Sequence, residues 1–111
     1  MTGYSFGDVI LVSFPFTDQS SSKQRPAAIV SSARYNAERR DLVIVAITSR
    51  LGGASFGEIA IHRWQEAGLL RPSAIKPVFA TIERGLVRRQ LGRLEEADGE
   101  ALHGMLRAVL G

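Results

Sequence analysis

The sequence predicts a mainly β fold, a small barrel of five to seven antiparallel strands with a C-terminal α-helix. Two observations carry this prediction. Short apolar runs rich in β-branched residues, separated by polar or glycine-containing breaks, recur up to residue 94. The apolar spacing then changes to a helical period near the C-terminus. Residues 1–111 are expected to form one domain, because 111 residues suffice for one core and not for two.

The apolar runs account for five or six short strands. The first run ends at Pro15, and the serine-rich stretch 18–23 that follows predicts a loop. Pro26 suits the first position of the next strand, where no ladder N–H is needed. Residues 36–40 predict a turn, and the run 42–47 is expected to be buried on both faces. The expected strands cover residues 9–14, 26–31, 42–47, 58–62, 78–82 and 90–94.

The last segment of the chain predicts an amphipathic helix. Acidic residues lie near its start, where they interact favourably with the positive end of the helix dipole. We expect this helix to cover an open end of the barrel. Its apolar face consists of Leu102, Met105, Leu106, Val109 and Leu110.

Composition narrows the classes of function. Hydrophobic residues make up 45% of the chain, which is enough for a packed core. The net charge of +3 permits a polyanionic partner without requiring one. The chain has no cysteine, which excludes disulfides and thiolate metal sites. Its two histidines, His62 and His103, lie far apart, and no cluster has metal-ligand spacing. We therefore expect no metal and no cofactor.

The N-terminus and the hydropathy pattern bear on where in the cell the protein is expected. The first residues lack the basic start and apolar core of a signal peptide. No apolar run approaches the length of a membrane span. The expectation is a cytoplasmic protein with no membrane partner.

Two stretches place cationic and hydroxyl side chains at the ends of expected strands. A guanidinium donates bidentately to phosphate and stays charged at any working pH. Small hydroxyls can orient a phosphoryl oxygen. Taken alone, the first stretch is better read as an exposed strand start and the second as a turn. The residues are Lys23, Gln24 and Arg25 in the first stretch and Thr48, Ser49 and Arg50 in the second.

RNA is a substrate that such groups can cut without a metal, because it carries its own nucleophile. The 2′-hydroxyl attacks the adjacent phosphorus, and the 5′-oxygen leaves. The protein must stabilise negative charge on the phosphoryl oxygens and help to move two protons. Asp8, Asp18 and His62 are candidate bases, although Asp18 also suits a loop cap. Three aromatic residues could stack on bases, with core or rim packing as the alternative: Tyr35, Phe56 and Trp64.

The order of these segments resembles the MazF/PemK family of toxins over nearly the whole chain. Arg-Pro followed about one strand later by Ile-Thr-Ser is the most specific part of the match, and the Gly-Asp-Val opening is weaker. The matching stretches are residues 7–12 (GDVILV), 25–27 (RPA), 47–49 (ITS) and 91–94 (LGRL).

The resemblance implies a toxin of a type II toxin–antitoxin pair that folds as an SH3-like barrel and forms a two-fold homodimer. It implies a sequence-specific, metal-independent endoribonuclease that leaves 2′,3′-cyclic phosphate and 5′-hydroxyl ends. Single-stranded RNA and a cognate antitoxin are the implied partners. By the same resemblance, Arg25 stabilises the phosphate and donates a proton. Thr48 holds the scissile phosphate, and Ser49 lies beside it.

One departure from the family pattern concerns the base. Many members carry an acidic residue shortly before the Thr-Ile that is found here at positions 81–82, where this chain has Lys76-Pro77-Val78. The general base is therefore unassigned, and Lys76 is expected to add a phosphate contact. The other expected substrate contacts are Asp18, Lys23, Gln24, Ser49 and Arg50.

Two other functions share this fold class. One is a toxin that poisons DNA gyrase and cuts nothing, and the other is a catalytically inactive SH3-like binding module. The pairing of Arg25 with Thr48 argues against the gyrase poison, because such a protein needs no phosphate pocket.

Overall fold

A computed structural model describes residues 3–13, 24–53 and 55–111 of the chain. Within them, six strands form one antiparallel sheet in the order β4-β5-β3-β2-β1-β6. The fold is mainly β, as predicted. The elements are β1 (Asp8–Ser13), β2 (Gln24–Ile29), α1 (Ala33–Glu38), β3 (Asp41–Thr48), β4 (Ile59–Ile61), β5 (Ser73–Glu83), the 3₁₀ helix η1 (Arg84–Leu86), β6 (Val87–Arg93) and α2 (Glu96–Leu110).

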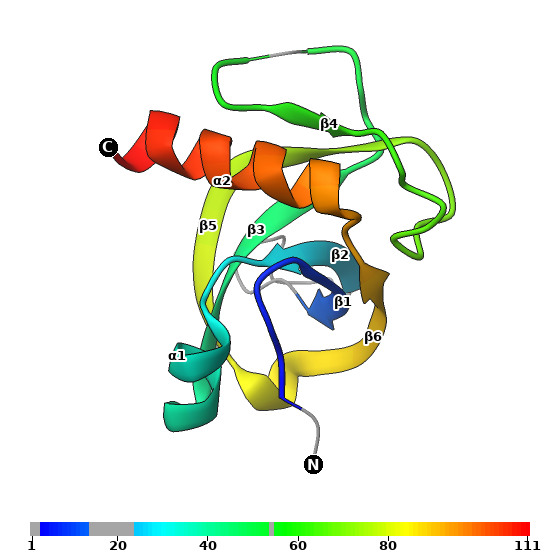
Figure 1. The fold of residues 1–111 in the computed structure, drawn as a ribbon. Coiled ribbons are helices and arrows are strands. Elements are labelled where there is room, and N and C mark those ends of the chain that lie inside the picture. Colours follow the sequence, from blue (N-terminus) through cyan, green and yellow to red (C-terminus); the bar gives the residue numbers. More distant parts are fainter. Residues whose placement is uncertain (1–2, 14–23, 54) are drawn as a thin grey trace.

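The sheet curls into a half-barrel, and α2 lies across one of its ends (Figure 1). Leu102 and Met105 of α2 are buried in a core cluster with Val9, Val45 and Ile75. The C-terminal helix therefore covers an open end of the curled sheet, as the sequence predicted. In the described part of the chain, no helix is long and apolar enough to cross a membrane.

A second core cluster lies on the opposite face of the central strands. Successive strand residues point to opposite faces, so Val9 joins the cluster under α2 while Ile10 joins the other. In β3, Val45 and Ile44 divide in the same way. Both faces of β1 and β3 are thus buried, which explains why these strands are continuous apolar runs.

Two segments differ from the sequence-based expectation. The stretch predicted as a turn contains part of α1, which begins after Ser32; the Ser32 hydroxyl accepts a hydrogen bond from the Tyr35 N–H (3.1 Å). Strand β5 is longer than predicted because it continues through Pro77. Residues 76–78 of β5 have no partner in β3, since the register shifts between Val45 and Ile47. A proline is tolerated there because no ladder hydrogen bond is lost.

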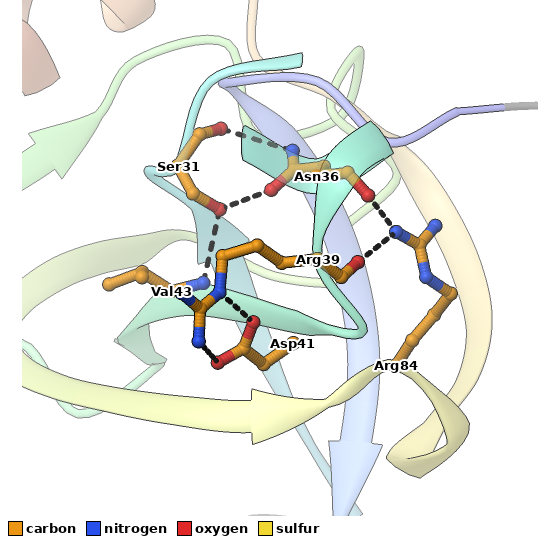
Figure 2. A network of polar contacts seen from close by, with 6 residues as sticks. All are labelled: Ser31, Asn36, Arg39, Asp41, Val43 and Arg84. Carbon is orange, nitrogen blue, oxygen red and sulfur yellow. Dashed lines mark hydrogen bonds and ion pairs between the residues drawn. The ribbon is translucent and has the colours of Figure 1, made fainter. Parts of the chain in front are cut away.

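A buried polar network (Figure 2) holds α1 in place at the end of the half-barrel opposite α2 (Figure 1). Asn36 is fully buried, and its side chain donates to the carbonyls of Tyr4 (2.9 Å) and Ser31 (3.1 Å). The Ser31 hydroxyl donates to Asn36 Oδ1 (2.5 Å) and accepts from the Val43 N–H (3.0 Å). The Arg84 guanidinium donates to the Asn36 carbonyl. Such satisfied buried networks fix one arrangement of the chain.

An ion pair lies beside this network. Arg39 Nε donates to Asp41 Oδ1 at 2.9 Å. This hydrogen bond lowers the pKa of Asp41 and raises the pKa of Arg39. The Arg39 side chain is exposed, so the pair contributes little to stability.

A buried carboxylate joins α2 to the segment after β4. Asp98 lies in the first turn of α2 and accepts the backbone N–H groups of His62 (3.1 Å) and Arg63 (2.9 Å). This contact fixes the start of the connection that leads from β4 to β5.

Two glycines bring that connection against β6. A Cβ on Gly68 would lie 2.1 Å from the Leu91 carbonyl oxygen, and a Cβ on Gly92 would lie 2.4 Å from the Ala67 oxygen. Gly68 also has a φ of +90°, which favours glycine, whereas Gly92 is required by the close approach alone. The atoms in the way are backbone, so neither clash is relieved by a side-chain movement.

Gly92→Ala should lower the free energy of unfolding by about 1–3 kcal/mol, because the new methyl group forces the connection away from β6. Thermal or urea unfolding measures the change. Gly104→Ala is the matched control, since nothing lies within 4 Å of its added Cβ. It should raise stability by about 0.5–1 kcal/mol through helix propensity. A Gly92→Ala protein as stable as the wild type would contradict the packing described here.

Candidate functional site

A pocket of about 710 Å³ lies where the Gly68–Gly92 contact brings the β4–β5 connection to the sheet. Its volume is that of a site for one small ligand or a short piece of a longer one. Seven lining residues have polar side chains: Arg25, Thr48, Ser49, Arg50, Arg71, Ser73 and Arg89. The others are Leu11, Pro26, Ile47, Gly68, Leu69, Leu70 and Leu91.

The strand register brings β2 and β6 together at this pocket. Strand β1 lies between them, and Leu11 pairs with Pro26 on one side and with Arg89 on the other. Arg25 precedes Pro26 and pairs with Val12. Arg25 and Arg89, which are far apart in sequence, therefore line the same pocket. Both side chains are exposed and accessible to a ligand.

The second polar stretch enters the pocket at the end of β3. Thr48 is the last residue of that strand and pairs with Ala74 of β5. Its Oγ1 accepts a hydrogen bond from the Arg50 N–H (3.0 Å). This turn holds the hydroxyl oxygen in place, and the described residues leave its O–H free to donate to a ligand.

The connection before β5 supplies the remaining wall. The Leu69 N–H donates to the Trp64 carbonyl (3.0 Å), and the Ser73 hydroxyl donates to the Arg71 carbonyl (2.9 Å). The first bond restrains the connection just before Leu70, and the second restrains it just after Arg71. Arg71 thus lines the pocket from a segment whose backbone is fixed.

The charged side chains that line the pocket are all positive among the described residues. Four guanidinium groups line it, and no carboxylate does among the residues that the structure describes. Like charges gathered in a concave site attract a polyanion and repel one another in its absence. The arrangement suits phosphate groups, which accept the paired N–H donors of arginine.

Four of the residues predicted from the sequence meet in this pocket: Arg25, Thr48, Ser49 and Arg50. Gln24 is exposed on β2, next to Arg25, but does not line the pocket. Lys76 lies in β5 and does not line it either. Asp18 and Lys23 lie outside the described residues.

The sequence-based reasoning missed Arg71, Ser73 and Arg89. One available signal was the pair Arg71-Pro72, which repeats the Arg25-Pro26 pattern at the entry to another strand. Arg89 gives no such signal, because it reaches the pocket through the pairing of β6 with β1.

The other candidates lie elsewhere. The buried Asp8 carboxylate accepts the Ser5 N–H (2.8 Å) and lies 3.8 Å from Arg93 Nε, so it holds the turn before β1. His62 is exposed and outside the pocket lining. Tyr35, Phe56 and Trp64 do not line the pocket. Among the residues described, no group of three or more metal-ligating side chains could hold a metal ion.

Comparisons with solved structures find the same fold. An endoribonuclease in complex with its cognate antitoxin from a mycobacterial species is 18% identical, with a TM-score of 0.79 over 97% of this chain and 95% of that one. MazF (Form-I) from Deinococcus radiodurans is 20% identical, with a TM-score of 0.78 over 100% and 99%. The Mycobacterium tuberculosis toxin MazF-mt6 is 19% identical, with a TM-score of 0.75 over 93% and 95%.

A comparison with curated proteins returns no match. At 18–20% identity, the solved structures support the fold alone. The family itself is shown by the sequence model, which matches residues 5–110. The chain belongs to the PemK-like, MazF-like toxins of type II toxin–antitoxin systems.

Proposed function

We propose that the protein is a sequence-specific endoribonuclease that cuts single-stranded RNA without a metal ion. The observation that supports this most is the pocket that gathers Arg25, Arg89 and Thr48 from three separate strands. Family membership and the endoribonuclease found among the structural neighbours agree with it. The proposed products carry a 2′,3′-cyclic phosphate and a 5′-hydroxyl.

The proposed reaction uses the nucleophile that RNA itself carries. The 2′-oxygen forms a bond to the adjacent phosphorus while the bond from phosphorus to the 5′-oxygen breaks. One proton leaves the 2′-hydroxyl and another reaches the 5′-oxygen. Negative charge builds on the phosphoryl oxygens in the transition state, and cationic donors fixed around them lower the barrier.

The pocket residues take roles that follow from their chemistry. Arg25 donates two hydrogen bonds to the phosphoryl oxygens and offsets the charge that develops there. Thr48, held by the Arg50 N–H, donates its O–H to the same phosphate, and Ser49 lies beside it. Of the described residues that line the pocket, none is a carboxylate or an imidazole. These residues are therefore assigned to binding and charge stabilisation, and Arg25 also to donating the proton that the 5′-oxygen takes up. None of them is assigned to removal of the 2′ proton.

Arg25→Ala should lower single-turnover cleavage by about 100- to 1,000-fold, because it removes a positioned charge from the transition state. Arg25→Lys should also be poor, since an ammonium cannot reproduce the paired donors. Thr48→Ala should lose less activity than Arg25→Ala, and Thr48→Ser should keep most activity, because the hydroxyl remains.

The assay is cleavage of one long single-stranded transcript by each folded variant, with folding checked by thermal unfolding. Arg34→Ala is the matched control, because Arg34 is exposed on α1 and does not line the pocket. Full activity of a folded Arg25→Ala protein would mean that RNA is cleaved at a site other than this pocket. No cleavage by the wild type would favour the gyrase poison or the binding module.

We further propose that a cognate antitoxin lays an acidic segment across the pocket. Two structural neighbours were solved with an antitoxin or as MazE–MazF. Carboxylates would take the phosphate positions on the four arginines. Binding would then exclude RNA by direct competition.

Arg25→Ala combined with Arg89→Ala should weaken antitoxin binding by at least about tenfold, since two charge-assisted contacts are lost. The salt dependence of the affinity should also fall. Calorimetry at two salt concentrations measures both effects. Arg34→Ala combined with Arg107→Ala removes the same charge away from the pocket and should change the affinity little. Equal effects of the two double variants would count against the proposed position.

We also propose a two-fold homodimer. A chain of 111 residues buries a limited share of its surface alone, and two-fold pairing is the commonest way to bury more. Light scattering at micromolar concentration should give about twice the mass of 12.1 kDa calculated for one chain. A monomer across this range would contradict the proposal.

A further inference from the structure

Leu70 lines the pocket, and its apolar side chain has no role in binding phosphate. Leu70 is 94% exposed, the largest exposure among the large apolar side chains of the described residues. Its neighbour Leu69 is buried in the core, and Arg71 follows it on the pocket wall. An apolar side chain therefore projects into solvent at the edge of a site lined by four arginines.

The exposure of Leu70 does not come from a loosely held segment. The Leu69 N–H donates to the Trp64 carbonyl at 3.0 Å. Gly68 packs against the Leu91 carbonyl so closely that a Cβ would lie 2.1 Å from its oxygen. The backbone on the N-terminal side of Leu70 is fixed on β6. The side chain is thus presented to a ligand with little backbone entropy left to lose on binding.

Phosphate contacts leave the bases of a bound RNA strand without partners. A nucleobase has a flat apolar face, and an unstacked base gains by covering that face. Beside the arginines, Leu11, Leu69, Leu70 and Leu91 give the pocket an aliphatic wall. Leu70 is the exposed member of this wall, so it has the most surface to bury against a base.

We propose that Leu70 is a platform for one base of the RNA strand, next to the phosphate that the arginines hold. This inference rests on the proposed function of the same pocket. The contact is with the face of the base, so it sets affinity more than it reads base edges. Purines gain more than pyrimidines because they cover more of the leucine. The contact exists before the bond breaks, so its loss raises KM and leaves kcat nearly unchanged.

The test measures binding separately from cleavage. The probes are two single-stranded oligonucleotides of equal length, one of purines and one of pyrimidines. Every 2′-hydroxyl is replaced by 2′-O-methyl, which removes the nucleophile. Fluorescence anisotropy gives the Kd for the wild type, Leu70→Ala, Leu70→Trp and the control Leu110→Ala. Leu110 is also an exposed leucine (67%), but it lies at the end of α2 and outside the pocket.

Leu70→Ala should weaken binding about fivefold, with the larger loss on the purine probe. Leu70→Trp should bind at least as tightly as the wild type, because an aromatic face stacks on any base. The slope of log Kd against log salt should be the same for Leu70→Ala and the wild type, since no charge is removed. Leu110→Ala should match the wild type, and thermal unfolding should show all variants folded.

Three outcomes overturn the inference. If the wild type binds and Leu70→Ala binds equally well, Leu70 is not a base platform, while the proposed function stands. If Leu70→Ala loses affinity for an antitoxin and not for the probes, Leu70 is a protein contact. If neither probe binds the wild type and no transcript is cut, the proposed function fails and the inference fails with it.

Discussion

The pocket depends on the close backbone approach of Gly68 to Leu91 and of Gly92 to Ala67. This approach closes the gap between the β4–β5 connection and the edge strand β6. It brings Arg71 on the connection and Arg89 on the strand into one pocket. A side chain at either glycine would separate the two walls. The two glycines are therefore required for Arg71 and Arg89 to line the same pocket.

The core supports this arrangement from both sides of the sheet. Apolar residues on the two faces of β1 and β3 hold these strands in a fixed register. That register in turn sets Arg25 and Arg89 on either side of β1. The rigid scaffold holds these positive charges close together although they repel one another. The pocket therefore attracts anions. In our proposal, the same attraction serves both the phosphates of RNA and the carboxylates of an antitoxin.

Apolar periodicity predicts the strands and helices that bury an apolar face. It does not predict which strands pair or in which register. The run 42–47 and the C-terminal helix were confirmed because a buried strand and an amphipathic helix each leave a pattern in the sequence. Helix α1 was missed because it depends on the Ser32 cap and on the hydrogen bonds of Asn36, which are single polar contacts. In the site, Arg25 and Thr48 lie at strand ends that the sequence marks. Arg89 enters only through strand register, which no local pattern reports.

The central claim is that this cationic pocket cuts RNA through the 2′-hydroxyl. The most direct measurement is to incubate the protein with a long single-stranded transcript in EDTA and to identify the chemical ends of the fragments. The account predicts cleavage at short preferred sequences, with 2′,3′-cyclic phosphate and 5′-hydroxyl ends. Fragments with 3′-hydroxyl and 5′-phosphate ends, or a transcript left intact, would contradict it.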